Sequence, residues 1–194
     1  MNNLIIKYLD EQIECIDKMK KISADALEKI LEILIQARNN NKKIFIMGNG
    51  GSASTASHFT SDLLKTSLIK NENKFKVISL TDNVPVILAW ANDTSYDEVF
   101  VNQLQNFLEK DDVIIGISGS GNSINVLKAV EYANNINAHT VSLTGKGGGK
   151  LAKISKTSLI VPSDDMLTIE TMHLMVCHIL TTMLRSMGQP VFSY

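Results

Sequence analysis

The sequence predicts an α/β protein with a three-layer, doubly wound fold, in which two N-terminal helices precede a five-stranded, mostly parallel sheet. Beyond residue 43, short apolar runs alternate with helical patterns, which is typical of strand–helix units stacked into a parallel sheet. Glycine-rich turns follow two of these runs, and no fixed-period repeat, low-complexity tract or linker interrupts the 194 residues. We therefore expect a single domain over residues 1–194.

Two helical patterns come first. Apolar residues recur every three or four positions over residues 4–22, and a second such stripe covers residues 24–37 after Ser23, a residue type favoured at helix N-caps. The helix pair, residues 1–40, is apolar on more than one side. It can pack against the rest of the chain or against another copy, and the pattern alone does not separate these alternatives.

The remaining elements alternate along the chain. Strands are expected at residues 44–47, 75–80, 113–117, 140–143 and 158–161, the last ending at Pro162. Helices are expected at residues 52–65, 84–91, 96–108 and 123–134, with a long final helix at about 164–187. Ligands of such folds gather at the carboxyl ends of the strands.

Charge and composition exclude several functions. Nineteen Lys and Arg against twenty Asp and Glu leave a formal net charge of -1, so neither nucleic acid nor an anionic membrane is expected as a partner. The apolar runs are shorter than the roughly 20 residues of a membrane span, and Asp10, Glu11 and Glu14 interrupt any signal peptide. We expect a cytoplasmic protein, with Cys15 and Cys177 as reduced packing residues.

The first expected strand runs into a glycine-rich loop. Residues 48–53, Gly-Asn-Gly-Gly-Ser-Ala, match the pattern G-x-G-x-x-G/A, which brings backbone amides close to an anion at a helix N-terminus. A dinucleotide site would also need an acidic residue about 20 positions on, and Asp82 comes too late. The alternative is a tight turn that serves packing only.

A second loop strengthens the case for an anion. Residues 118–123, Ser-Gly-Ser-Gly-Asn-Ser, again separate a buried strand from a helix, and serines and free amides without Lys or Arg suit a phosphate monoester. The alternative is that Ser123 merely caps the next helix. A third glycine cluster, residues 145–150, fails as a nucleotide P-loop because Leu151 stands where a Ser or Thr is required.

Two pairs of side chains could perform chemistry. His58 and Asp62 are four residues apart in an expected helix and point the same way. Glu170 and His178 are eight apart, about 80° around the final helix and roughly 12 Å along it, so in one site they would have to stretch toward each other or come from different subunits. His173 lies on the far side of Glu170 and is expected to be a packing or supporting residue.

Two histidines and two carboxylates form a reasonable set for a zinc-type ion, and the same side chains could equally act as base and acid. The alternative for each histidine taken singly is a buried core residue.

The motifs together resemble a known family. The chain is similar to the phosphoheptose isomerases, which are sugar isomerase (SIS) domain proteins, over nearly its whole length. The resemblance rests on four separated motifs in the right order: residues 48–53 with His58-Phe59, Asn92-Asp93 followed by residues 96–100, the loop 117–123, and the helix from Glu170 to His178.

The resemblance implies conversion of sedoheptulose 7-phosphate to D-glycero-D-manno-heptose 7-phosphate, the first step toward nucleotide-activated heptoses for lipopolysaccharide, capsule or surface glycans. It implies a homotetramer with sites at subunit interfaces, packed partly through residues 1–40, and one Zn²⁺ per subunit. Asp62 and His178 would be base and acid. The implied zinc ligands are His58, Asp62, Glu170 and His178, and the implied substrate-binding residues are Asn49, Gly50, Gly51, Asn92, Asp93, Ser118, Gly119, Ser120, Ser123 and Glu170.

The sequence also departs from the family. Asp62 replaces a Glu, Glu170 replaces a Gln, and Leu167 and Thr168 replace an Asp-Arg pair. An isomerase acting on a different sugar phosphate is therefore a second interpretation, since altered carboxylates could accompany an altered substrate. A third is a non-catalytic SIS protein that binds another protein; that branch loses the carboxylate and the final histidine, so Asp62 and His178 argue against it.

Overall fold

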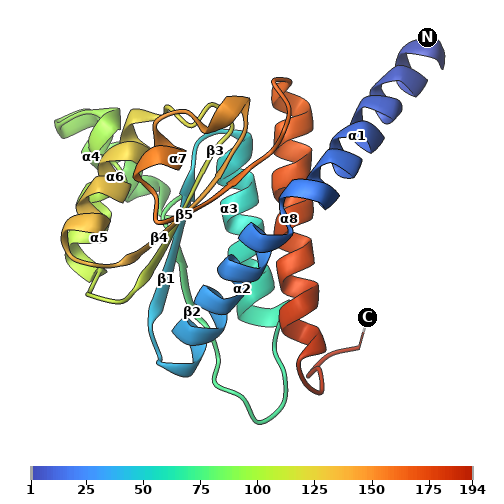
Figure 1. The fold of residues 1–194 in the computed structure, drawn as a ribbon. Helices are drawn as coiled ribbons and strands as arrows, with labels where there is room; N and C mark the ends of the chain where they lie inside the picture. Colours follow the sequence, from blue (N-terminus) through green and yellow to red (C-terminus); the bar gives the residue numbers. More distant parts are fainter. Residues whose placement is uncertain (1, 194) are drawn as a thin grey trace.

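The structure, a computed structural model, describes residues 2–193 (Figure 1). Its main helices are α1 (Asn2–Ile22), α2 (Ala24–Asn39), α3 (Gly51–Ser61), α4 (Val84–Asp93), α5 (Val101–Phe107), α6 (Ile124–Asn135), α7 (Leu151–Ile154) and α8 (Met166–Ser186). The strands are β1 (Lys43–Gly48), β2 (Lys76–Ser79), β3 (Val113–Ser118), β4 (His139–Thr144) and β5 (Thr157–Ile160). Three short turns complete the set: η1 (Asp62–Thr66), η2 (Tyr96–Glu98) and η3 (Lys146–Gly148).

The predicted α/β fold is confirmed. The five strands form one sheet in the order β2-β1-β3-β4-β5, and every neighbouring pair is parallel. The chain leaves β1 toward one edge and later returns to place β3 on the other side of β1. The carboxyl ends of β1 and β3 therefore border the crevice where ligands bind in sheets of this kind.

Helices cover both faces of the sheet (Figure 1). One layer contains α2, α3 and α8, and its core includes Leu34, Phe59 and Met172. The other contains α4 to α7, and its core includes Phe100 and Val130. Burial of the apolar side chains in the first layer holds α3 and α8 against each other beside the sheet.

Helix α1 behaves differently from the other long helices. Only Cys15 and Met19 are buried in it, and its N-terminal half projects away from the body of the molecule (Figure 1). Leu4, which is 71% exposed, and Ile13, 58% exposed, belong to an uncovered apolar stripe. The expected N-cap role of Ser23 is wrong, because its side chain makes no capping hydrogen bond and its backbone is helical, so α1 runs almost directly into α2.

The helix expected at residues 96–108 is also corrected. It is divided into η2 and α5. Val99 and Phe100, between the two, are both almost fully buried. The hydrogen-bond spacing changes here: the Val99 N–H lies 3.5 Å from the Tyr96 carbonyl, three residues back, whereas the Leu104 N–H donates to the Phe100 carbonyl, four residues back, at 3.0 Å.

Helix α8 is long and apolar enough by composition to cross a membrane, with a mean hydropathy of 1.3 over an 18-residue window, but half of that window is buried inside the protein. It packs against α2 and α3 and is a core helix of this fold. Both cysteines are buried free thiols, as predicted, and burial raises the pKa of Cys177 far above its ordinary value.

Candidate active site at the ends of β1 and β3

A cavity of about 270 Å³ opens at the carboxyl ends of β1 and β3. It gathers most of the residues predicted to bind substrate. Its lining consists of Asn49, Gly50, Gly51, Ser52, Ile117, Ser118, Gly119, Ser120, Ser123, Met166 and Glu170. Among the described residues, Glu170 is the one charged side chain in this lining, so any anion bound here would be held by neutral donors.

The first wall of the cavity is the turn from β1 into α3. Gly50 lies directly before the helix with φ of +54°, a backbone conformation that a side chain would strain. The helix then begins at Gly51, whose hydrogen atom faces the Glu170 carboxylate so closely that a Cβ there would collide with it. The N-terminus of α3 therefore borders the cavity, with the Ser52 and Ala53 N–H groups donating to the Asn49 carbonyl of the turn at 3.0 and 3.3 Å.

The second wall is the serine loop between β3 and α6. The hydroxyls of Ser118 and Ser123 lie 3.0 Å apart, and the backbone N–H of Asn122 donates to Ser120 Oγ at 3.2 Å. Ser123 makes no side-chain cap to α6, so the interpretation of this residue as a mere helix cap is wrong. Its hydroxyl faces the other serine instead.

The third glycine cluster supports the serine loop from behind. The Leu151 N–H donates to the Gly121 carbonyl at 2.9 Å, and the Gly145 N–H donates to the Gly119 carbonyl at 3.1 Å. Gly149 lies against the carbonyl oxygens of Ser120 and Gly121 at a distance that leaves no room for a side chain. The cluster thus holds the loop backbone in place.

Asn92 and Asp93, also predicted to bind substrate, lie at the exposed end of α4. Asn92 Nδ2 donates to Asp93 Oδ1 at 2.8 Å, and neither residue lines the cavity. The link to the cavity comes from η2, because the Tyr96 hydroxyl lies 2.8 Å from Asn49 Oδ1.

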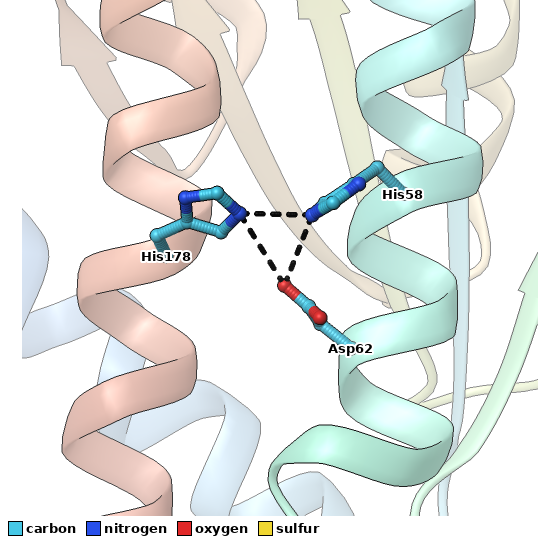
Figure 2. Close-up of side chains that lie close together, drawn as sticks. All are labelled: His58, Asp62 and His178. Atoms are coloured by element: carbon cyan, nitrogen blue, oxygen red, sulfur yellow. Dashed lines mark hydrogen bonds and ion pairs between the residues drawn. The ribbon is translucent and has the colours of Figure 1, made fainter. Parts of the chain in front are cut away.

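A second group lies further along α3 and α8. His58 and Asp62 from α3 and η1 meet His178 from α8, and all three point toward one another (Figure 2). The two Nε2 atoms are 2.8 Å apart, and Asp62 Oδ2 lies 3.4 Å from His58 Nε2 and 3.9 Å from His178 Nε2. The three donor atoms thus lie within 4.8 Å of one another.

Local structure explains how the three side chains meet. His58 and Asp62 are one turn apart on the same face of a helix. At Asp62 the helix widens into a π-turn, in which the Ser67 N–H donates to the Asp62 carbonyl five residues back. Such turns occur preferentially at functional sites. The packing of α3 on α8 then supplies His178, 120 residues away along the chain.

Glu170 is not brought to this group. It lies two helical turns before His178, and its carboxylate is beside Gly51 at the cavity. Within one chain the structure therefore unites three of the four predicted zinc ligands and leaves Glu170 with the substrate-binding set. His58 follows Gly51 by seven residues, so about 10 Å separates the two regions along α3.

His173 is a packing residue. It is fully buried, and neither ring nitrogen has a hydrogen-bond partner among the described residues. Burial lowers its pKa to about 4 and outweighs the opposing effect of the nearby Thr144 backbone. The imidazole is therefore neutral inside the core at neutral pH.

Sequence reasoning did not single out Asn125. This residue is 2% exposed at the start of α6 and forms two hydrogen bonds with Asn49. Its position two residues after the serine loop is the only signal in the sequence, and that signal does not reveal the partner 76 residues away.

The fold and the cavity define a doubly wound α/β protein with its cavity at the carboxyl ends of the central strands. The SIS domain family model matches residues 7–145 of the chain. A phosphoheptose isomerase from Helicobacter pylori is 44% identical over 181 residues, covering 93% of each chain, and one from Aliarcobacter butzleri is 38% identical, covering 92% of this chain and 94% of the relative. The chain belongs to the SIS domain family and, within it, to the phosphoheptose isomerases.

Solved structures agree with this assignment. A phosphoheptose isomerase from Neisseria gonorrhoeae superposes with a TM-score of 0.88 at 31% identity, covering 95% of this chain and 98% of that chain. One from Francisella tularensis has a TM-score of 0.89 at 28% identity, covering 95% and 97%. The sequence resemblance is therefore confirmed.

Proposed function

We propose that this protein is an aldose–ketose isomerase that converts sedoheptulose 7-phosphate to D-glycero-D-manno-heptose 7-phosphate through an enediol. The observation that carries the proposal is the alignment, along α3 and α8, of a charge-poor cavity at helix N-termini with a His–Asp–His group about two helical turns away. The product supplies nucleotide-activated heptoses for lipopolysaccharide, capsule or surface glycans. The proposed compartment is the cytoplasm.

The cavity is the phosphate end of the proposed site. Ser118, Ser120 and Ser123 offer hydroxyls, while α3 and α6 direct their N-termini at the same space. Hydroxyls and backbone amides hold a phosphate through directed hydrogen bonds without a lysine or arginine. Asn49, Gly50, Gly51 and Glu170 would contact the adjoining sugar carbons.

The length of the substrate fits the separation of the two regions. An extended chain advances about 1.2 Å per bond, and eight bonds lead from the phosphorus of a heptulose 7-phosphate to C1, so the molecule spans about 10 Å. That length equals the distance of about 10 Å along α3 from Gly51 to His58. A substrate with its phosphate in the cavity beside the N-terminus of α3 would therefore extend along this helix toward the His–Asp–His group with C1 and C2.

The group at the other end would move protons. In the proposed mechanism the Asp62 carboxylate takes a proton from C1 and returns it to C2, while His178 gives a proton to the C2 oxygen and receives one from the C1 hydroxyl. This exchange passes through an enediol and leaves both residues in their starting states. His58 Nε2 lies 2.8 Å from His178 Nε2, so one of the two facing imidazole nitrogens carries a hydrogen and the other accepts it.

The same residues fit a Zn²⁺ ion. Zinc bonds of about 2.0–2.1 Å at tetrahedral angles place two ligand atoms roughly 3.3 Å apart, and the separations here are 2.8, 3.4 and 3.9 Å. His58, Asp62 and His178 would hold the ion, and three protein ligands leave a position for substrate. When bound, it would polarise the carbonyl and hydroxyl oxygens. Glu170 could join such a site only from another copy.

A homotetramer with sites between subunits is the proposed assembly. The uncovered apolar stripe of α1 includes Leu4, Ile5, Leu9 and Ile13. Helix α4 is apolar as well, yet none of its residues is buried, and Leu88 is 63% exposed. Exposed apolar surfaces of this extent favour burial against other copies of the chain.

The function is tested by incubating the protein with sedoheptulose 7-phosphate and following the aldose product by NMR, once after zinc loading and once after chelation. We expect turnover by the loaded protein, at least tenfold slower turnover after chelation, and no turnover of unphosphorylated sedoheptulose. A panel of pentulose and hexulose phosphates separates this hypothesis from isomerisation of another sugar. Absence of aldose from every sugar phosphate would contradict the proposal.

A further inference from the structure

The Asn49 amide is held from two sides at the rim of the cavity. Asn49 Nδ2 donates to Asn125 Oδ1 at 2.9 Å, and Asn125 Nδ2 donates to Asn49 Oδ1, also at 2.9 Å. The Tyr96 hydroxyl lies 2.8 Å from the same Asn49 oxygen. Three elements that are distant in the sequence, the β1–α3 turn, α6 and η2, are joined through this one side chain.

The direction of each hydrogen bond follows from one backbone group. The Val126 N–H belongs to the first turn of α6, has no partner inside the helix, and donates to Asn125 Oδ1 at 2.9 Å. A backbone N–H can only donate, so the atom that faces it has to be the Asn125 oxygen. The other polar atom of the Asn125 amide, Nδ2, therefore donates to Asn49, and the atom that it faces is Asn49 Oδ1. Because this oxygen can only accept, the Tyr96 hydroxyl is the donor in its contact with Asn49.

These hydrogen-bond directions leave one group of the Asn49 amide available to a ligand. Its oxygen accepts from both Asn125 and Tyr96, which uses both lone pairs, and one Nδ2 hydrogen is taken by Asn125. The remaining Nδ2 hydrogen is all that Asn49 can offer to a ligand in the cavity that it lines. The cavity thus presents a hydrogen-bond donor here.

We propose that Asn125 is a positioning residue that sets the polarity of the Asn49 amide, so that the substrate meets a donor and never the amide oxygen. The proposal rests on the proposed function, since its ligand is the sugar phosphate, whose phosphate and hydroxyl oxygens are acceptors. Asn125 is 2% exposed and does not line the cavity, so it acts through Asn49. The Lys128–Glu98 ion pair holds η2, and with it Tyr96, against α6.

The test is Asn125→Asp. The introduced carboxylate keeps the acceptor for the Val126 N–H and adds a negative charge near the N-terminus of α6, which the helix dipole favours, so the fold is retained. The carboxylate cannot donate to Asn49, so in either orientation the Asn49 amide oxygen faces a carboxylate oxygen and the amide is no longer held in one position. Its Nδ2 hydrogen is then no longer fixed toward the cavity, and we expect KM to rise at least tenfold while kcat stays within about threefold.

Two further variants distinguish the effect of the Asn49 amide orientation from the effect of the added negative charge and from a general loss of structure. Ile124→Asp places the same charge on the exposed neighbouring residue, without touching the amide pair, and is expected to leave KM within about twofold. In an Asn49→Ala background, Asn125→Asp is expected to have no further effect on KM, because it acts only through Asn49. An equal rise in KM for Ile124→Asp, or an undiminished effect in the Asn49→Ala background, would overturn the proposal.

A measurement without substrate keeps this result distinct from the proposed function. In labelled free protein, NMR contacts between the Asn49 side-chain N–H and the Tyr96 ring are expected to be weak in the wild type and stronger in Asn125→Asp, where the amide is no longer held in one orientation. The increase is expected even if the wild type turns over no sugar phosphate, an outcome that refutes the proposed function alone. Unchanged contacts in the variant would overturn the positioning role.

Discussion

The cavity at the ends of β1 and β3 and the His58–Asp62–His178 group share the helices α3 and α8, yet they are built in different ways. The cavity is made mainly of two loops, each directly after a strand, and its donors are hydroxyls and backbone N–H groups. The His–Asp–His group consists of side chains that meet only because two helices pack together. Under the proposed function, the anchoring residues are therefore close together in the sequence, whereas the proton-transferring residues are far apart.

The difference extends to solvent exposure. Ser118 is almost fully buried and the serine loop is supported by the glycine cluster behind it, whereas the side chains of His58 and His178 are 47% and 53% exposed. Under the proposed function, a buried serine loop beside half-exposed histidines suits an active site that is completed by a second copy of the chain, and the proposed tetramer would supply that copy.

The largest expected effect separates chemistry from anchoring. Asp62→Asn keeps the shape of the side chain but removes the proton acceptor, so kcat is expected to fall by about 10³-fold while KM and the dissociation constant for inorganic phosphate stay within about threefold. Steady-state kinetics and calorimetry measure the two quantities. Asp25→Asn on the exposed start of α2 is the control. Unchanged turnover in Asp62→Asn would remove this residue from the mechanism.

A second prediction concerns the part of α8 that connects the two regions. Burial lowers the His173 pKa to about 4 in the folded protein, below the ordinary value of 6.5. Between pH 6.5 and 4 the unfolded chain takes up a proton here and the folded chain does not, so the free energy of unfolding falls as the pH falls. The loss is expected to reach about 3 kcal/mol at pH 4.

His173→Leu removes this contribution. Urea unfolding at pH 7 and pH 5 is expected to show a smaller loss of stability on acidification for the variant than for the wild type. Equal losses in the two proteins would show that His173 is accessible to protons in the folded state. Activity at pH 7 is expected to be retained, because His173 belongs to neither region.

The smallest expected effect tests the anchoring side of the comparison. Ser120→Ala removes one of several neutral donors in the serine loop, and KM for the sugar phosphate is expected to rise about five- to tenfold with kcat nearly unchanged. Ser186→Ala, at the end of α8, is the matched control. A loss of kcat in Ser120→Ala as large as that in Asp62→Asn would contradict the proposed separation between a phosphate-binding cavity and a proton-transferring group.

Much of the fold could be predicted from the sequence because its patterns are local. Every strand and most helices lie within a few residues of the expected positions. The exceptions are the helix expected at residues 96–108, which is divided at Val99 and Phe100, the π-turn at Asp62, which ends another expected helix early, and the short helix α7, which was not expected. These are changes of hydrogen-bond spacing or single helical turns, which are too local to leave a mark on hydrophobic periodicity.

The site shows the same division at the level of single residues. The loops after β1 and β3 were recognisable because glycine and serine spacing reflects the backbone geometry that an anion requires. The pairing of His58 and Asp62 followed from helical spacing. Helical spacing did not predict that His178, and not Glu170, lies beside them. Both residues are on α8, and only the position of α8 along α3 decides which of them comes close.

By itself, the sequence determined the mostly parallel α/β architecture, the two anion-type loops and the pairing of His58 with Asp62, since each depends on residues close together in the chain. The tertiary structure alone decided which of those residues meet: the cavity that keeps Glu170, the group that takes His178, and the amide pair of Asn49 and Asn125. These contacts join positions separated by 76 to 120 residues, and their geometry is set by packing of helices, which no local pattern encodes.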